Sequence, residues 1–274
     1  MAIDNIFNTK LFGETMLQRN ARKEGAPPAG NEFFADEDYI MDSAGAESNV
    51  AIGLSRLLDT KRTRTVWVSR FGDDKEADHI LEFLADQDIE VVAPKIKGQK
   101  TGKSYVHHLE GGSKKIYKRK GSAASKMQFS DVKPHLTDTH LVHVTGITPA
   151  LSDSCYLATL GTLSHCQDHN IPVSFDANYR EQLWKNPEEA RRVFDDMLPY
   201  ANFFKVGHDE AKNVWNLDYT PEQYAEFFAE RTGGIIVVTR DSGGAIALED
   251  GKLYEHPGFE VDTSKGDSIG AGDA

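Results

Sequence analysis

The chain alternates between short apolar runs and longer stretches in which apolar positions recur with helical spacing. The short runs are rich in Val, Ile, Phe and Trp and end at glycine or polar residues, which is typical of strands in a buried sheet. The predicted strands are 10–17, 63–72, 89–94, 140–146, 171–178, 201–206 and 234–240. The predicted helices are 47–58, 75–87, 152–170 and 186–198, with two more within 208–232. This order predicts an α/β protein with a mainly parallel sheet covered by helices.

Two stretches interrupt the alternation. Residues 25–42 and 98–120 carry turn residues and strand-like pieces without a strong helical pattern. In the second stretch, "KSYVHHL" and "KKIYKRK" flank "EGGS", which predicts a hairpin. We expect the two stretches to form a small β flap on the α/β body.

Length and charge narrow the class of protein. The 274 residues are enough for a well-buried core in one large α/β domain with a small appendage. The net charge of -12 argues against a general affinity for nucleic acid, although a local basic pocket is compatible with it. No apolar run approaches the roughly 18 residues of a membrane span, and the first ten residues do not have the pattern of a secretory signal. We therefore expect a cytoplasmic protein that binds neither nucleic acid nor membrane.

Cys155 and Cys166 are the only cysteines, and both fall in the predicted helix 152–170. Their spacing puts them near one face of that helix, and no cluster of histidines or further cysteines completes a zinc pattern. We expect buried free thiols rather than a disulfide.

The stretch "SAGAESNVA" (43–51) opens a predicted helix at Gly45 and places Asn49 on its first turn. It fits a helix cap with a buried Asn, and it also fits a backbone and amide surface for a polyhydroxylated ligand. In "IYKRKGSAAS" (116–125), Tyr117 and Arg119 alternate along a strand and should point to one face. The arginine fork suits a carboxylate, while the surrounding lysines also fit a solvated basic strand.

The stretch "FDANYREQLW" (175–184) follows a predicted strand. Asp176, Asn178 and Arg180 crowd its carboxyl end, where ligands bind in open α/β sheets. The same residues also fit a helix cap with Asp and Asn in a turn.

The last ten residues, "KGDSIGAGDA" (265–274), combine glycines with carboxylates. Gly270, Ala271 and Gly272 look like a helix start, whose unpaired N–H groups suit an anion. The stretch is neither a dinucleotide fingerprint nor a Walker phosphate loop. Asp267 before the glycines and Asp273 directly after them suggest phosphoryl transfer to a hydroxyl.

Taken together, these stretches resemble the ribokinase-like sugar kinases, the PfkB carbohydrate kinase family. "DSIGAGDA" is similar to the family's Asp-Thr-Thr-Gly-Ala-Gly-Asp signature, with Ser268-Ile269 in place of Thr-Thr, and "AGAESNVAIGL" resembles its N-terminal glycine motif. "YKRKGSAAS", "TGITPALS" and "FDANYREQLW" resemble segments of 2-keto-3-deoxygluconate kinases in the same order. The resemblance runs from roughly Gly13 to Ala274. It implies one ribokinase-like kinase domain over 1–274, three-layered α/β/α, with a mainly parallel sheet and a small β-sheet lid. Family members continue beyond the signature, so the C-terminal part of the pattern is missing here.

The activity implied by the resemblance is ATP-dependent phosphorylation of the primary hydroxyl of 2-keto-3-deoxygluconate. Asp273 would take the hydroxyl proton, and the N–H groups of residues 270–272 would stabilise the transferring phosphoryl group. Thr239 and Gly244 match the region that cradles the ATP phosphates, and the glycines of the signature would contribute to it. The implied sugar contacts are Gly45, Asn49, Tyr105, Tyr117, Arg119, Arg180 and Asp267.

The resemblance also implies Mg²⁺ bound with ATP, and it leaves a monovalent cation open. The family usually has an Asn three residues before a Glu after the "FFKV" strand, serving the hydrated magnesium. Here Gly207 stands at the Asn place, while Glu210 remains. The lid would form a homodimer interface, with Tyr105, Ile116 and Tyr117 on its apolar side. Two other functions stay open: a kinase of this family for a neutral sugar such as fructose or ribose, and a sugar- or nucleotide-binding protein on the same fold without turnover.

Overall fold

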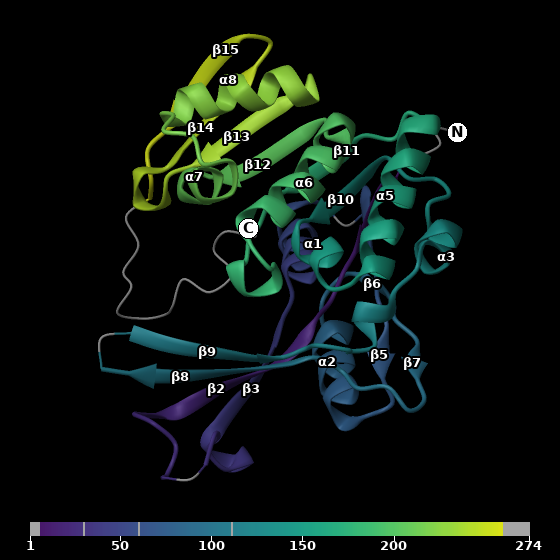
Figure 1. Cartoon of the computed structure of the whole chain (residues 1–274). Helices are drawn as coiled ribbons and strands as arrows, with labels where there is room; N and C mark the ends of the chain where they lie inside the picture. The colour runs from purple at the N-terminus through teal and green to yellow at the C-terminus, as the bar shows by residue number, and fades with distance from the viewer. Residues whose placement is uncertain (1–5, 30, 60, 111, 260–274) are drawn as a thin grey trace.

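The computed structural model describes residues 6–29, 31–59, 61–110 and 112–259. The first group of elements forms one large sheet and comprises β1 (Phe7–Phe12), β4 (Thr63–Val68), β6 (Glu90–Val92), β10 (Leu141–Thr145), β11 (Val173–Asp176), β12 (Phe203–Gly207), β13 (Ile235–Thr239), β14 (Ala245–Glu249) and β15 (Lys252–His256). Its strand order is β15-β14-β13-β12-β11-β10-β1-β4-β6. Figure 1 shows the run from β15 to β10. Every pair from β6 to β13 is parallel, and only β14 and β15 run antiparallel at one edge. The predicted mainly parallel α/β sheet is confirmed, although the strands β14 and β15 were not predicted.

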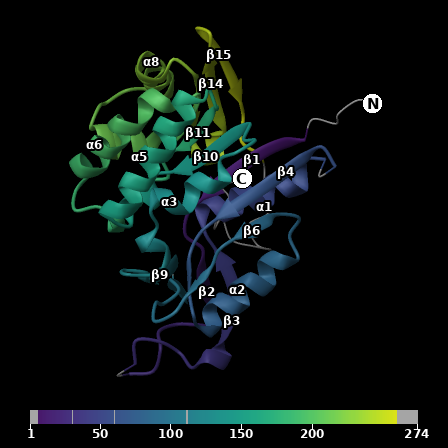
Figure 2. The ribbon, with the colours of Figure 1, turned by 90° about the vertical axis from the view of Figure 1, so that its right-hand side faces the viewer.

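Helices cover both faces of this sheet. The α-helices are α1 (Ala46–Leu57), α2 (Lys75–Ala85), α3 (Phe129–Val132), α4 (Ile147–Ala150), α5 (Asp153–Asp168), α6 (Pro187–Met197), α7 (His208–Trp215) and α8 (Pro221–Thr232). Single 3-10 turns are η1 (Asp36–Asp38), η2 (Ala124–Lys126), η3 (Lys133–His135), η4 (Glu181–Leu183), η5 (Leu198–Tyr200) and η6 (Asp241–Gly243). Figure 2 shows α5, α6 and α8 on one side of the sheet and α1 on the other.

Two hydrophobic cores follow from the alternation of side chains along the strands. Phe12 of β1 packs in the core shared with α5, α6, α7 and α8, while its neighbour Leu11 packs in the core shared with α1 and α2. Trp67 of β4 belongs to the second core and is fully buried. The predicted three-layer α/β/α arrangement is therefore present.

A second, four-stranded sheet forms the flap. Its strands are β2 (Met16–Glu24), β3 (Tyr39–Ala44), β8 (Lys103–Leu109) and β9 (Gly112–Lys118), in the order β3-β2-β8-β9. The predicted hairpin is confirmed, because β8 and β9 pair antiparallel with Tyr105 opposite Ile116. We call this sheet the lid. A separate two-stranded sheet joins β5 (Phe71–Gly72) to β7 (Lys95–Ile96).

Two predicted strands are not continuous. Residues 63–72 divide into β4 and β5, which lie in different sheets. Residues 10–17 are not continuous: β1 ends at Phe12, the segment 13–15 leaves the large sheet, and β2 begins at Met16 in the lid. The lid accordingly contains residues 16–24 besides the two predicted segments. Their strand was missed because β2 reads "MLQRNARKE", in which buried polar residues such as Gln18 and Arg19 replace an apolar alternation.

The lid does not have the single apolar side that was expected. Ile116 lies opposite Tyr105, whereas Tyr117 lies opposite Ser104. Because neighbouring residues of a strand point to opposite faces, Tyr117 is on the other face from Tyr105 and Ile116.

The two cysteines behave as predicted. Cys155 and Cys166 are buried free thiols on α5. Burial raises the pKa of the Cys166 thiol to about 12.

Among the helices that the structure describes, none is both long and apolar enough to span a membrane.

Candidate active site

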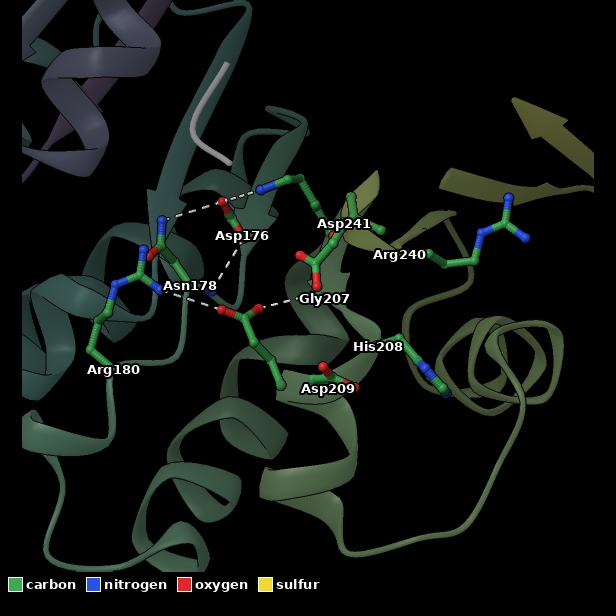
Figure 3. Close-up of a pocket in the computed structure, with 11 residues that line it drawn as sticks. Asp176, Asn178, Arg180, Gly207, His208, Asp209, Arg240 and Asp241 are labelled. Carbon is green, nitrogen blue, oxygen red and sulfur yellow. Dashed lines mark hydrogen bonds and ion pairs between the residues drawn. The ribbon is translucent and has the colours of Figure 1, made fainter. Parts of the chain in front are cut away.

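The carboxyl ends of three neighbouring parallel strands meet at one edge of the large sheet. Asp176 ends β11, Gly207 ends β12 and Thr239 ends β13. With the loops that follow, they enclose a cavity of about 310 Å³, which we call the strand-end cavity (Figure 3). Its walls are formed by Asp176, Asn178, Arg180, Lys205, Gly207, His208, Asp209, Glu210, Thr239, Arg240 and Asp241. Thr239, Arg180 and Glu210, which were predicted to contact the ATP phosphates, the sugar and magnesium respectively, all line this cavity.

Asp176 organises one side of this cavity. Its Oδ2 accepts a hydrogen bond of 2.6 Å from Lys205 Nζ on the next strand, and its Oδ1 accepts one of 3.1 Å from the backbone N–H of Asn178. Asn178 has a φ of 38°, in the left-handed region that Asn tolerates better than most residues. This turn directs the chain back toward the cavity, where Figure 3 shows Asn178 and Arg180 across from His208 and Arg240.

Glu210 lies on the first turn of α7 with its carboxylate in the strand-end cavity. Its Oε2 accepts a hydrogen bond of 3.0 Å from the N–H of Gly207, and its Oε1 lies 3.4 Å from Nη1 of Arg180. Burial raises the pKa of the Glu210 carboxyl, and the nearby Asp176 carboxylate adds to this, while the Gly207 N–H, Arg180 and Lys205 oppose it. A cation arriving in the cavity would therefore favour the ionised form of Glu210.

The carboxylates of the strand-end cavity fit a magnesium ion that is bound mainly through the phosphates of a ligand. Within the described ranges, no group of three or more His, Cys, Asp or Glu side chains is placed to hold a metal by itself. The strand-end cavity does offer carboxylate oxygens from Asp176, Asp209, Glu210 and Asp241. Mg²⁺ usually keeps several waters and binds through one or two carboxylates plus substrate phosphates, and this cavity supplies that kind of surrounding.

A second cavity, of about 440 Å³, adjoins the lid. Its walls are formed by Tyr117, Arg119, Lys120, Ala150, Leu151, Arg180, Gln182 and Leu183, and we call it the arginine cavity. These residues come from the three segments "YKRKGSAAS", "TGITPALS" and "FDANYREQLW", which lie far apart in the sequence. The structure thus brings Tyr117, Arg119 and Arg180, three of the predicted sugar contacts, to one cavity.

Arg180 belongs to both cavities. It follows the Asn178 turn, immediately before η4, and its side chain is 46% exposed. It lines the strand-end cavity and the arginine cavity at the same time. A ligand that occupies both would pass this guanidinium.

Arg119 is held in place by a buried carboxylate. Its Nε donates a hydrogen bond of 2.7 Å to Oε2 of Glu14, a carboxylate that is fully buried between β1 and β2. The guanidinium carbon of Arg119 lies 5.6 Å from the centre of the Tyr117 ring. Glu14 was not predicted as a site residue, because nothing in the motif "FGET" indicates which distant side chain it meets.

Lys205 was also missed. It lies in the run "FFKV", where a lysine interrupts an otherwise apolar strand. The pairing of β11 with β12 places it directly beside Asp176. That interruption was the available signal, since a charged residue in a buried strand needs a partner.

Several predicted residues lie away from the two cavities. Tyr105 packs on the other face of the lid from Tyr117, with its ring centre 4.0 Å from that of Phe33. Gly45 and Asn49 begin α1, and neither forms part of either cavity wall. The predicted sugar contacts of these three residues lie outside the two cavities formed by the described residues, and they stay predictions.

Gly244 does not line the strand-end cavity either. Its φ is 86°, and a Cβ added there would lie 2.1 Å from the carbonyl oxygen of His256. The tight turn between β13 and β14 thus explains this glycine without a ligand. Five further predicted residues fall outside the described part of the chain, namely Asp267, Gly270, Ala271, Gly272 and Asp273.

The chain is similar to known carbohydrate kinases in sequence and in structure. The model of the pfkB family carbohydrate kinases matches residues 9–274. The 2-dehydro-3-deoxygalactonokinase of Haloferax volcanii is 29% identical over 270 residues, covering 96% of this chain and 80% of that protein. The 2-dehydro-3-deoxygluconokinase of Bacillus subtilis is 30% identical over 269 residues, covering 96% and 78%. A crystal structure of a PfkB protein from Polaromonas sp. JS666 superposes with a TM-score of 0.83 at 30% identity, covering 97% of this chain and 85% of that one.

The fold is that of the ribokinase-like kinases. The chain belongs to the pfkB family of carbohydrate kinases and is an ATP-dependent sugar kinase.

Proposed function

We propose that the sugar is the acid 2-keto-3-deoxygluconate and that the product is its 6-phosphate. The observation that carries this proposal is the arginine cavity, whose walls include Arg119, Arg180 and Tyr117. Two guanidinium groups in one cavity suit a carboxylate, which a neutral sugar lacks. The names of the bacterial and archaeal relatives, both kinases of deoxy sugar acids, support the same class of substrate.

In this proposal the two cavities hold the two substrates. The sugar acid lies in the arginine cavity, and the ATP phosphates lie in the strand-end cavity beside Lys205, Thr239 and Arg240. Arg180 stands at their border, where it meets the sugar acid or the transferring group. Closely placed reactants gain rate from orientation alone, and cationic side chains stabilise the phosphoryl charge.

The chemical step moves one phosphoryl group. The primary hydroxyl oxygen of the sugar forms a bond to the γ-phosphorus as the bond from that phosphorus to the bridging β–γ oxygen breaks, so that ADP leaves. We propose Asp273 as the base that receives the hydroxyl proton, and the N–H groups of Gly270, Ala271 and Gly272 as donors to the phosphoryl oxygens. This assignment rests on the sequence motif.

Magnesium, when bound with ATP, neutralises charge on the β- and γ-phosphates. Glu210 and Asp176 are the carboxylates that would orient the hydrated ion in the strand-end cavity. A requirement for a monovalent cation is tested in the same assay by exchanging K⁺ for Na⁺ or for a bulky organic cation.

A close alternative is the galactonate-derived acid named for the Haloferax relative. That acid has the same carboxylate and 2-keto group, so the arginine cavity accepts either. A neutral sugar such as fructose is the other alternative, and the paired arginines argue against it.

A substrate panel tests the proposal. Purified full-length protein is assayed with ATP and Mg²⁺ on both deoxy sugar acids, fructose and ribose, and the products are located by NMR. We expect the highest kcat/KM on 2-keto-3-deoxygluconate, with phosphate on the primary hydroxyl. The highest kcat/KM on fructose or ribose would reject the sugar-acid assignment, and preference for the galactonate acid would correct it to the alternative.

The base is tested by Asp273→Asn. Loss of a general base typically lowers the rate about 10²–10⁴-fold. We expect that loss in kcat while the calorimetric Kd for the sugar acid stays close to that of the wild type. A variant with most of its kcat intact excludes Asp273 as the base.

A further inference from the structure

Glu14 lies where the chain passes from the large sheet into the lid. It sits between β1 and β2, and its side chain is 0% exposed. Oε2 accepts the 2.7 Å hydrogen bond from Arg119 Nε, and Oε1 accepts one of 2.6 Å from the hydroxyl of Ser122. Each carboxylate oxygen thus has a donor from the segment that leaves the lid after β9.

Neighbouring glycines leave no spare room around Glu14. A Cβ on Gly102 would lie 2.6 Å from Glu14 Oε1, and a Cβ on Gly45 would lie 2.3 Å from the main-chain oxygen of Glu14. Both glycines are at points where the chain crosses between body and lid, as Glu14 itself is. The carboxylate is therefore fixed by close packing as well as by its two hydrogen bonds.

The guanidinium of Arg119 is fixed on one edge and available on the other. Its side chain is 10% exposed, its Nε is used by Glu14, and its guanidinium carbon lies 5.6 Å from the Tyr117 ring centre. Within the described ranges, neither Nη atom makes a hydrogen bond, and the residue lines the arginine cavity. The two Nη atoms form the fork that binds a carboxylate, so the fixed edge directs that fork to the cavity.

Stability alone does not account for this buried pair. Glutamate is almost never fully buried unless it is paired, and burying two charges costs desolvation energy that often equals their attraction. Such a pair is weak evidence for a stabilising role. The geometry of the pair holds the Arg119 side chain in one orientation. An arginine that is already held loses less side-chain entropy when it binds a ligand than a mobile one does.

We propose that Glu14 is a positioning residue for recognition of the substrate carboxylate, acting through Arg119. This inference rests on the proposed function, since it requires an acidic sugar in the arginine cavity. Ser122 supports it by holding the second oxygen of Glu14. Glu14 makes no contact with the sugar in this arrangement, and its effect appears only with substrates that carry the carboxylate.

The test compares the sugar acid with its neutral carboxamide in wild type, Glu14→Gln, Arg119→Ala and the double variant. A charged hydrogen bond is worth about 10-fold or more in affinity. We expect Glu14→Gln to raise KM for the acid by about 10-fold while changing KM for the carboxamide less than about twofold, with a smaller change in kcat. In the Arg119→Ala background, Glu14→Gln should have no further effect on KM, because coupled residues are non-additive.

Glu76→Gln is the matched control for the loss of a buried ion pair. Glu76 binds Arg19 at 3.3 Å and Lys103 at 2.6 Å and lies outside both cavities, so this variant should change KM for the acid and the carboxamide equally or not at all. Should Glu14→Gln fail to fold, Ser122→Ala carries the test, with a smaller rise in KM for the acid only.

The outcomes separate the two proposals. If the wild type does not use the sugar acid, the proposed function fails and this inference fails with it. If the wild type uses the acid but Glu14→Gln changes both KM values alike, or adds its effect to that of Arg119→Ala, only the positioning role is overturned.

Discussion

Arg180 Nη1 lies 3.4 Å from Glu210 Oε1, and this ion pair spans from the border of the arginine cavity into the strand-end cavity. The arginine side chain is 46% exposed, and exposed ion pairs contribute little to stability. Arg180 is therefore able to exchange Glu210 for an anionic ligand at small cost. In the proposed function, this pair would connect recognition of the sugar acid to the place where the phosphates bind.

Arg180→Ala should raise KM for an acidic sugar much more than for any neutral sugar that is accepted. A charged hydrogen bond lost from such a site is worth roughly 1.5–3 kcal/mol, or about 10-fold or more in KM. Steady-state kinetics with both kinds of sugar checks this. Arg191→Ala is the control, because Arg191 is also an exposed arginine paired with an acid, Asp195, but lies on α6 outside both cavities. Equal effects on acidic and neutral sugars would remove the carboxylate role of Arg180.

Glu210→Gln should make the protein more stable at pH 7 while raising the Mg²⁺ concentration needed for half-maximal activity. Burial raises the pKa of Glu210 above its ordinary 4.5. At a pH between 4.5 and this raised pKa, the folded chain keeps a proton that the unfolded chain has lost. Stability therefore falls as the pH rises through that window, and the cost of the ionised carboxylate remains in full above it. Glutamine stays neutral and avoids that cost. Chemical denaturation from pH 4 to 8 should show the gain above the window and none below pH 4.5.

Glu189→Gln is the control of opposite sign. The backbone N–H of Lys185 lowers the pKa of Glu189, so its ionised form stabilises the fold above the ordinary pKa. Replacing it should leave stability at pH 7 equal or lower. A Glu210→Gln variant that is less stable than the wild type at pH 7 would show that its contacts outweigh the burial.

Gly45→Ala should destabilise the fold, and Gly53→Ala should stabilise it, although both glycines belong to the same helix region. A Cβ at Gly45 would lie 2.3 Å from the main-chain oxygen of Glu14, whereas nothing lies within 4 Å of a Cβ at Gly53. Overpacking costs typically 1–3 kcal/mol, and alanine in a helix interior gains roughly 0.5–1 kcal/mol over glycine. Urea denaturation of the two variants measures both signs. A stabilised Gly45→Ala would show that α1 shifts freely against the 13–15 segment.

The lid should form a homodimer through the face that carries Tyr105 and Ile116. Phe33 already stacks on Tyr105 on that face and Ile116 is half-buried there, but β9 is an edge strand of the lid, and an open sheet edge is a liability that a second chain can cover. Light scattering should find a dimer for the wild type and a monomer for Ile116→Asp. Ser113→Asp introduces the same charge on the opposite face of β9 and should remain dimeric. A monomeric wild type with full activity would show that the lid works without a partner.

The sequence predicted those parts of the fold in which each element has its own periodic signal. The strand–helix alternation, the β8–β9 hairpin and the two free thiols all followed from local patterns. The break at 13–15 did not, because β2 uses polar side chains inside the protein: Arg19 is buried and binds Glu76 at 3.3 Å. A charged residue that is satisfied by a distant partner looks, in the sequence alone, like a surface residue.

The candidate site shows the same limit. Tyr117, Arg119 and Arg180 were predicted because each lies in a recognisable segment, and the structure brings them to one cavity. Glu14 and Lys205 were not, because their roles arise from pairings between segments that no local pattern reveals. Tyr105 was placed on the wrong side of the lid relative to Tyr117, since the register that decides the face is fixed by strand pairing.

The connectivity of the lid has a consequence for how the chain folds. β2 pairs in parallel with β8, with Leu17 opposite Lys103, and everything from β3 to β7 lies between them in the sequence. Closing so long a loop is entropically costly until the intervening segment is itself compact. The lid should therefore be completed late, after β1, β4 and α1 have docked. Pulse-labelling hydrogen exchange during refolding should find the amides of β2 and β8 protected together, and later than those of β1 and β4.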